Sequence, residues 1–127
     1  STMAQYAVMP AFEDDSFIQG YIEKYDNRRK YGYELFNQIP GVSVLMPEAG
    51  FYFWINVKKL GTSAEVASYL VKEALVNCND GKFYGSQGEG YLRVIFAVFA
   101  DDKDCYAAFD RMADAFRKLA AERGITE

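Results

Sequence analysis

Histidine is absent from this chain of 127 residues, and cysteine is scarce, with two residues. The absence of histidine excludes Ser-His-Asp and Cys-His nucleophile systems, and it removes nearly every transition-metal site except an all-carboxylate one. We therefore expect neither a catalytic triad nor metal ligands in this chain. Cys78 lies in a polar stretch and Cys105 lies far away, at the start of a helical pattern. A disulfide stays open, but we favour two buried thiols of a cytoplasmic protein.

An excess of positive charge and a long apolar run are also missing. The net charge is −4, whereas a nucleic-acid binder needs clustered Lys and Arg to displace the counterions of phosphates. No stretch of about twenty apolar residues is free of charged residues, so no segment is expected to span a membrane. The first residues show neither the basic start nor the apolar run of a secretory signal. We expect a cytoplasmic protein that binds neither nucleic acid nor membranes.

Aromatic residues, in contrast, are abundant. Ten Phe, ten Tyr and one Trp belong to an apolar half of the composition, which supplies far more apolar area than a disordered chain carries. At this length one domain is expected, and it buries roughly two-thirds of the surface of its unfolded chain. The composition therefore predicts one folded domain with a real core.

Helical spacing of apolar residues is clearest over residues 17–39, and Pro40 ends that pattern. Charged residues, Arg28 among them, fall off the apolar stripe. A shorter helix is predicted around residues 4–8, ended by Pro10. A helix as long as the one over residues 17–39 is typical of a strut between layers.

Two more helices follow later in the chain. Thr62 and Glu65 have the spacing of a capping box, which predicts the start of a helix. Asp101 or Asp102 caps the last predicted helix, whose apolar residues recur at intervals of four and three: Cys105, Phe109, Met112, Phe116 and Leu119.

Strand patterns lie between these helices. Residues 42–46 and 51–57 are β-rich runs, and the turn over 47–50 predicts that they pair as an antiparallel hairpin. Residues 76–78 predict a short strand, and residues 91–98 predict a third strong one with two alternating faces. The fold class is therefore α+β: a small antiparallel or mixed sheet packed against the long N-terminal helix and two further helices.

Arg93 is the residue of these predicted strands that most clearly indicates a chemical function. A guanidinium in the middle of an apolar strand cannot lose its charge, so it needs an anionic partner or an open cleft. One interpretation is an ion pair with an acidic residue, or a side chain that reaches solvent from an edge strand. The other is a fork that binds a ligand carboxylate through two parallel hydrogen bonds. The pattern alone leaves both open.

Two other features favour structural roles. The glycine-rich stretch over 81–90 lacks the Gly-Lys-Ser/Thr end of a phosphate loop, and no helix begins after it, so we expect a turn that leads into a strand. The aromatic residues over 51–54 are more typical of a core than of a ligand platform.

Five segments together carry a family resemblance. Residues 1–7 and 15–29 are similar to the stretch after the lysine region and to the long interdomain helix of class I/II aminotransferases. Residues 47–54 resemble the Pro-x-x-Gly-x-Phe/Tyr strand of that family. Residues 81–85, with their Gly-x-x-Phe/Tyr-Gly pattern, and 90–94, Gly-Tyr-Leu-Arg-Val, resemble its closing signature. The chain thus resembles the C-terminal, small domain of these pyridoxal-phosphate enzymes of fold type I, which are similar to aspartate aminotransferase. Asp80 departs from the proline that is common there.

The resemblance implies an enzyme that moves an amino group between an amino acid and a 2-oxo acid with pyridoxal phosphate. It divides the chain into a remnant of the interdomain or large-domain segment (1–16), the small domain (17–121) and a C-terminal tail (122–127). The family's Schiff-base lysine and phosphate-binding residues precede the region that this chain matches. The resemblance therefore implies a homodimeric parent enzyme with a large domain that is missing here, and a chain that is inactive by itself.

At the matching positions, the resemblance implies that Arg93 binds the α-carboxylate of the substrate. Gly50, Phe51 and Tyr52 are further candidates for substrate binding. No catalytic, cofactor-binding or metal-binding residue is expected in this chain. A hypothesis of another class stays open, in which the chain is a stand-alone α+β domain that binds a small carboxylate through Arg93 without catalysis. A lysine-bearing large domain encoded upstream of Ser1 would favour the aminotransferase.

Overall fold

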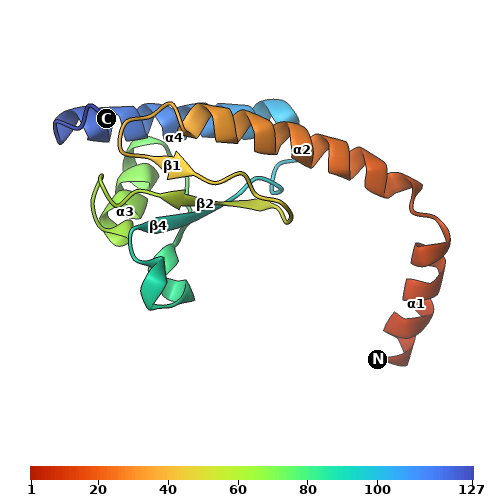
Figure 1. Ribbon diagram of the computed structural model, residues 1–127. Coiled ribbons are helices and arrows are strands. Elements are labelled where there is room, and N and C mark those ends of the chain that lie inside the picture. Colours follow the sequence, from red (N-terminus) through yellow and green to blue (C-terminus); the bar gives the residue numbers. More distant parts are fainter.

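The computed structural model describes residues 1–127 and has a four-stranded antiparallel sheet at its centre (Figure 1). The strands, in their order across the sheet, are β1 (Ser43–Val44), β2 (Tyr52–Asn56), β4 (Tyr91–Ile95) and β3 (Asn79–Asp80). The two longer strands, β2 and β4, are neighbours, and Trp54 is the register partner of Arg93. The predicted α+β class with a small sheet is confirmed, and every strand pair is antiparallel.

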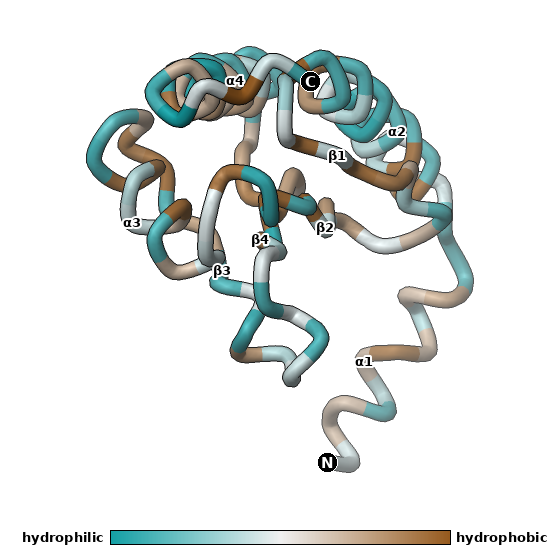
Figure 2. The backbone as a smooth tube through the Cα atoms, turned by 60° about the vertical axis from the view of Figure 1, so that its left-hand side comes forward, coloured by the Kyte–Doolittle hydropathy of each residue, from teal (hydrophilic) through white to brown (hydrophobic).

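Two long helices cover one face of the sheet. α2 (Ser16–Phe36) and α4 (Asp102–Glu122) lie side by side above it (Figure 2). α3 (Ser63–Glu73) packs against α4 and β4 near β3. The two short 3-10 turns, η1 (Gly81–Tyr84) and η2 (Ser86–Gly88), lie on the side of the sheet away from α2 and α4, and α1 (Thr2–Glu13) projects away from both layers (Figure 1).

Phenylalanine rings join the two long helices to the sheet. Phe36 of α2, Phe53 of β2 and Phe109 of α4 are buried, and their ring centroids lie 5.5–5.9 Å apart in pairs. Burial of each ring contributes about 1.5–3 kcal/mol, so these contacts hold the layers together. Gly32 allows the close approach of α2, because a Cβ at this position would lie 2.6 Å from the ring of Phe53.

Several predicted boundaries differ from the structure. Pro10 does not end the first helix, which runs on to Glu13. Proline has no backbone N–H, so one carbonyl of the preceding helical turn lacks its hydrogen-bond donor. Because no residue of α1 is buried, water can hydrate this carbonyl instead. The long helix ends at Phe36 rather than at residue 39. The hairpin prediction is right about antiparallel pairing, but Val44 pairs with Ile55, so the connection is wider than the turn predicted over 47–50.

The later elements follow their predictions more closely. The capping box at the start of α3 is confirmed: the Glu65 amide donates to Thr62 Oγ1 at 3.3 Å, and the Thr62 amide donates to Glu65 Oε2 at 3.2 Å. The predicted short strand over 76–78 is wrong by a few residues, because the pairing with β4 occurs at Asn79–Asp80 instead. Asp101 stands at the N-cap position of α4, as predicted, but its side chain makes no capping hydrogen bond. The five predicted apolar residues of this helix are buried.

Both cysteines are free thiols. Cys105 is buried, whereas Cys78 is only half-buried, which corrects the expectation of two buried thiols. Burial raises the pKa of each thiol to about 11, so both are protonated at neutral pH. None of the helices is long and apolar enough to cross a membrane.

Candidate functional site

Arg93 lies in the middle of β4, and β4 is an interior strand with β2 on one side and β3 on the other. Its neighbours Leu92 and Val94 are buried. Because side chains alternate along a strand, Arg93 points to the opposite face, toward the 3-10 turns. The guanidinium therefore leaves the sheet on its outer face, and the edge-strand interpretation of Arg93 is wrong.

No carboxylate neutralises Arg93. The chain has five ion pairs, and none of them includes this guanidinium. Its partners are aromatic: Cζ lies 4.5 Å from the ring centroid of Tyr52 and 5.6 Å from that of Tyr84, and Nη1 donates a hydrogen bond to the Tyr84 hydroxyl at 3.4 Å. The structure thus contradicts the ion-pair interpretation. It leaves a charged fork whose other N–H groups can bind an anion.

Aromatic side chains surround the Arg93 guanidinium on the outer face of the sheet. The rings of Trp54 and Tyr91 are stacked at 5.6 Å, and Tyr84 meets Trp54 edge-on at 5.7 Å. Trp54 is also the register partner of Arg93, so their Cβ atoms are cross-strand neighbours. We call the group of Tyr52, Trp54, Tyr84, Tyr91 and Arg93 the Arg93 site. Its rings correct the expectation that the aromatic residues over 51–54 are mainly core, since only Phe53 among them is buried.

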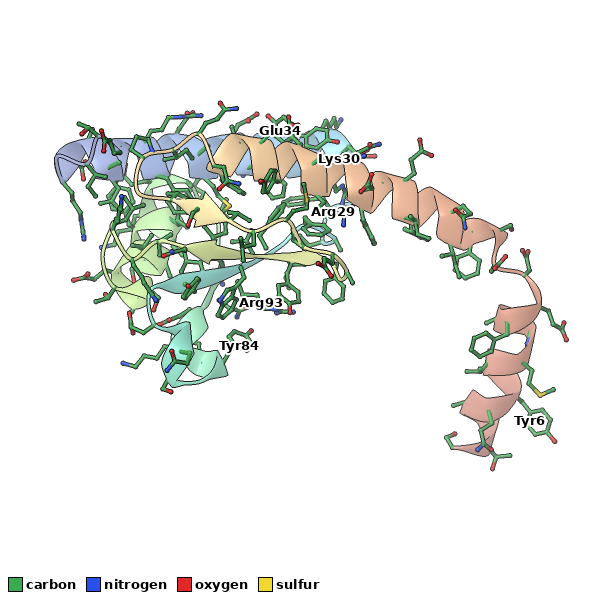
Figure 3. All side chains as sticks on the ribbon, viewed as in Figure 1. Tyr6, Arg29, Lys30, Glu34, Tyr84 and Arg93 are labelled. Atoms are coloured by element: carbon green, nitrogen blue, oxygen red, sulfur yellow. The ribbon has the colours of Figure 1, made fainter.

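The loop between β3 and β4 brings Tyr84 to Arg93, and both side chains lie below the sheet in Figure 3. Two glycines allow the loop to fold back on itself. A Cβ on Gly88 would lie 1.9 Å from the carbonyl oxygen of Gly81, and a Cβ on Gly81 would lie 2.3 Å from that of Gly88. Asp80 Oδ1 accepts a hydrogen bond from the Lys82 amide at 2.9 Å and so caps the first turn of the loop. The loop is therefore a defined structure rather than a simple turn.

Glu89 ties the end of this loop to α3. Its Oε1 atom accepts hydrogen bonds from the Ser63 amide at 3.0 Å, the Ser63 hydroxyl at 3.1 Å and the Gly90 amide at 3.1 Å. The bond from the Ser63 amide is the main reason why the pKa of Glu89 lies below its ordinary value. The carboxylate thus fixes the point at which the chain enters β4.

The sequence indicated three further candidates for substrate binding, and they lie in different places relative to the Arg93 guanidinium. Tyr52 belongs to the site, because its ring stacks with the Arg93 guanidinium. Phe51 lies just before β2 and its carbonyl accepts the Phe96 amide at 3.0 Å, while its ring is half-exposed. Gly50 lines a separate groove between α2 and the turn over 47–50. The structure therefore brings only Tyr52 to Arg93.

Tyr84 is a residue of the site that was not predicted from the sequence. The tyrosine lies in the glycine-rich stretch, and the signal that could have found it is the Gly-x-x-Tyr-Gly pattern that leads toward the strand of Arg93. A second residue, Arg28, was counted among the charged residues off the apolar stripe, yet it is fully buried.

Two hollows lie next to the site. An apolar groove of about 540 Å³ runs along β1 and is lined by Tyr52, Trp54 and Tyr91 together with Met46 and other residues of that edge. A smaller pocket of about 300 Å³ has Arg93 in its wall. No group of three or more acidic or thiol side chains could hold a metal ion.

The chain is similar to known proteins over most of its length. The family model "Aminotransferase class I and II" matches residues 1–110. The chain therefore belongs to the class I and II aminotransferase family. The closing signature inferred from the sequence corresponds to the loop of Tyr84 and the strand of Arg93 in this fold.

Particular relatives are similar over nearly the whole chain. Aspartate aminotransferase from Pyrococcus abyssi is 29% identical over 129 residues, and aromatic-amino-acid aminotransferase 2 from Thermococcus litoralis is 30% identical over 128 residues. Both matches cover 98% of this chain and 31% of the relative, so the chain spans about a third of the length of these proteins.

Solved structures agree with the sequence matches. An aromatic aminotransferase from Pyrococcus horikoshii OT3 superposes with a TM-score of 0.81 at 28% identity, covering 96% of this chain and 32% of the other. A putative aminotransferase from Clostridium difficile, solved with PLP bound, gives a TM-score of 0.70 at 25% identity, covering 80% of this chain and 26% of the other.

The two hollows next to Arg93 do not fit pyridoxal phosphate. No lysine lines the apolar groove or the pocket next to Arg93, and no basic residue other than Arg93 and Arg111 lines either hollow. Arg111 already donates a hydrogen bond to the Ala74 carbonyl at 3.0 Å. We therefore assign no chemical step of the cofactor to this chain.

Proposed function

We propose that this chain is the C-terminal, small domain of a longer pyridoxal-phosphate-dependent aminotransferase, which moves an amino group between an amino acid and a 2-oxo acid. In this proposal residues 1–16 belong to the interdomain or large-domain segment, 17–121 to the small domain and 122–127 to a tail. The large domain supplies the cofactor and its lysine. The parent enzyme is a cytoplasmic homodimer.

Within that enzyme, Arg93 binds the α-carboxylate that amino-acid and 2-oxo-acid substrates share. The observation that supports this role is a guanidinium without a carboxylate partner in an interior strand, held against Tyr52 and Tyr84. Two parallel N–H groups fit the two oxygens of a carboxylate, so the contact fixes the direction of the Cα–carboxylate bond as well as its place. Arg93 thus orients the substrate for a reaction that other residues perform.

Substitution of Arg93 in the enzyme that contains this chain tests the role. Arg93→Leu removes a charge-assisted, bidentate contact, and we expect kcat/KM to fall by roughly ten- to a hundredfold or more. Arg93→Lys recovers only part of the loss, because one ammonium group cannot copy a planar fork. Arg117→Leu is the matched control, since Arg117 is exposed on α4 and pairs only with Asp114. Unchanged kcat/KM together with lower stability of Arg93→Leu would refute the carboxylate role.

A second experiment tests the division of labour between this chain and the large domain. The chain alone is mixed with pyridoxal phosphate, an amino acid and 2-oxoglutarate, and glutamate is measured. We expect no turnover at an enzyme-like rate, because no lysine lines the hollows next to Arg93. A complete aminotransferase in the same assay is the positive control, and glutamate formation by the chain at a comparable rate would contradict the proposal.

A further inference from the structure

Tyr84 places a hydroxyl group directly beside the guanidinium of Arg93 (Figure 3). In their hydrogen bond Arg93 Nη1 is the donor and the phenolic oxygen is the acceptor, at 3.4 Å. A tyrosine hydroxyl also carries one proton that it can donate, and arginine has no acceptor to receive it. No other hydrogen bond of the Tyr84 hydroxyl occurs in the chain. Its proton is therefore free for a group that binds next to Arg93.

The position of this hydroxyl is set by contacts on two sides. The Tyr84 ring meets Trp54 at an interplanar angle of 82°, and Trp54 lies opposite Arg93 on the neighbouring strand. The backbone that carries Tyr84 is held by the close crossing of Gly81 and Gly88. Tyr84 thus reaches Arg93 from a loop whose path allows side chains at neither of these two glycines.

A carboxylate bound to Arg93 has room for a third hydrogen bond. Its two oxygens offer about four lone-pair positions, and a guanidinium fork uses two of them. The remaining positions need donors, and the Tyr84 hydroxyl is the neutral donor adjacent to the fork.

We propose that the Tyr84 hydroxyl donates a hydrogen bond to the carboxylate held by Arg93, which makes Tyr84 a substrate-binding residue. This inference rests on the proposed function, because it takes Arg93 as the carboxylate fork. It assigns a role to the hydroxyl, which a phenylalanine at the same position lacks. The ring alone gives the cation–π contact with Arg93 and the edge-on contact with Trp54.

Binding to the 127-residue chain, measured by NMR titration, tests the proposal with two probes of the same shape. One probe is 3-phenylpropionate, a carboxylate, and the other is its neutral amide, 3-phenylpropanamide. Tyr84→Phe removes only the hydroxyl, and we expect the Kd of the carboxylate to rise about three- to tenfold. The Kd of the amide should rise less, because its carbonyl oxygen is a neutral and weaker acceptor. Tyr6→Phe is the matched control, because Tyr6 is an exposed tyrosine of α1 far from the site (Figure 3).

Arg93→Leu separates this inference from the proposed function. If Arg93→Leu weakens carboxylate binding and Tyr84→Phe does not, the hydroxyl has no role while the role of Arg93 stands. If neither substitution changes the Kd of the carboxylate, both proposals are overturned. An equal loss of affinity for both probes in Tyr84→Phe would show that the hydroxyl does not act on the charged carboxylate, which also overturns the proposal.

Discussion

Arg28 is a charged residue with no exposed surface, and it joins three parts of the chain. Arg28 lies in α2, and its Nε donates a hydrogen bond at 2.7 Å to Oδ1 of Asp102, the first residue of α4. Its Nη1 donates a second hydrogen bond, at 2.8 Å, to the carbonyl of Phe96, which follows β4. Nη2 has no partner. The guanidinium therefore fixes where the chain leaves the strand of Arg93 and enters the last helix.

Removing Asp102 and removing Arg28 are expected to lower the free energy of unfolding by different amounts. Asp102→Ala leaves a buried cation without its counter-ion and should lower the free energy of unfolding by about 3–5 kcal/mol. Arg28→Met should cost less, about 1–2 kcal/mol, because Asp102 is 40% exposed and can be hydrated. In Arg28→Met the Phe96 carbonyl also keeps one hydrogen bond, which it accepts from the Cys105 thiol at a distance of 3.6 Å. Denaturant unfolding measures both values.

Asp104→Ala is the control for this pair, since Asp104 lies in the same first turn of α4 but is exposed. It should change stability by a few tenths of a kcal/mol. A larger loss for Arg28→Met than for Asp102→Ala would contradict the asymmetry.

The sequence allowed Arg93 to be singled out but not Arg28. A lone arginine among Leu92, Val94 and other apolar strand residues is visible in a short window, and its outward direction follows from alternation. Arg28 lies among other charged residues of a helix, and its partners are 68 and 74 residues away in the sequence. The burial of Arg28 depends on these distant partners, so the residues next to it in the sequence do not indicate it.

Among the elements, the loop from η1 to β4 depends on one carboxylate for its attachment to α3. The pKa of Glu89 is lowered chiefly by the hydrogen bond from the Ser63 amide. A carboxyl group whose folded-state pKa is depressed stabilises the fold above its unfolded pKa, and this contribution disappears as the pH falls through the folded value. The attachment should therefore weaken in acid.

Glu89→Gln tests this dependence on pH. We expect a lower Tm than that of the unsubstituted chain at neutral pH, with the difference shrinking as the pH falls below 4.5, the ordinary value of this group. Thermal unfolding followed by circular dichroism across this range gives the comparison. Glu48→Gln, at an exposed carboxylate with no hydrogen-bond partner, should show little difference at any pH. A Tm difference for Glu89→Gln that is the same at neutral and acid pH would contradict the role of its charge.

Local chemistry explains which elements could be predicted. Thr62 and Glu65 form the start of α3 by themselves, so a spacing of three residues was sufficient. The edge strand Asn79–Asp80 has no apolar alternation and exists because β4 offers it hydrogen bonds. Pro10 was misjudged for a related reason, since its effect depends on whether water reaches the helix, which the local sequence does not show.

At the scale of the whole molecule, the N-terminal part carries an exposed apolar surface. No residue of α1 is buried, and the first two turns of α2 are exposed as well. We define the N-terminal apolar surface by its exposed large side chains: Met3, Tyr6, Val8, Met9, Phe12, Phe17, Ile18, Tyr21 and Ile22. Monomeric proteins seldom leave contiguous apolar patches of several hundred Å² exposed.

We expect the chain to associate through the N-terminal apolar surface. Light scattering should show an apparent mass that rises with protein concentration, and Phe12→Ser combined with Phe17→Ser should suppress the rise. Phe83→Ser is the control, because Phe83 is 83% exposed but lies in the loop on the outer side of the sheet. A strictly monomeric chain at high concentration, without binding of a dye that reports exposed apolar surface, would contradict this expectation.

The contacts of the Arg93 guanidinium with the rings of Tyr52 and Tyr84 have a consequence for the thermodynamics of ligand binding. A free arginine side chain carries about 2 kcal/mol of rotamer entropy, which a ligand must overcome when it fixes the side chain. Here the two rings and the surrounding strands restrict the guanidinium when the chain folds, before any ligand arrives. Less ordering then opposes binding, and the contact should have a smaller entropic penalty than the same arginine on an open surface.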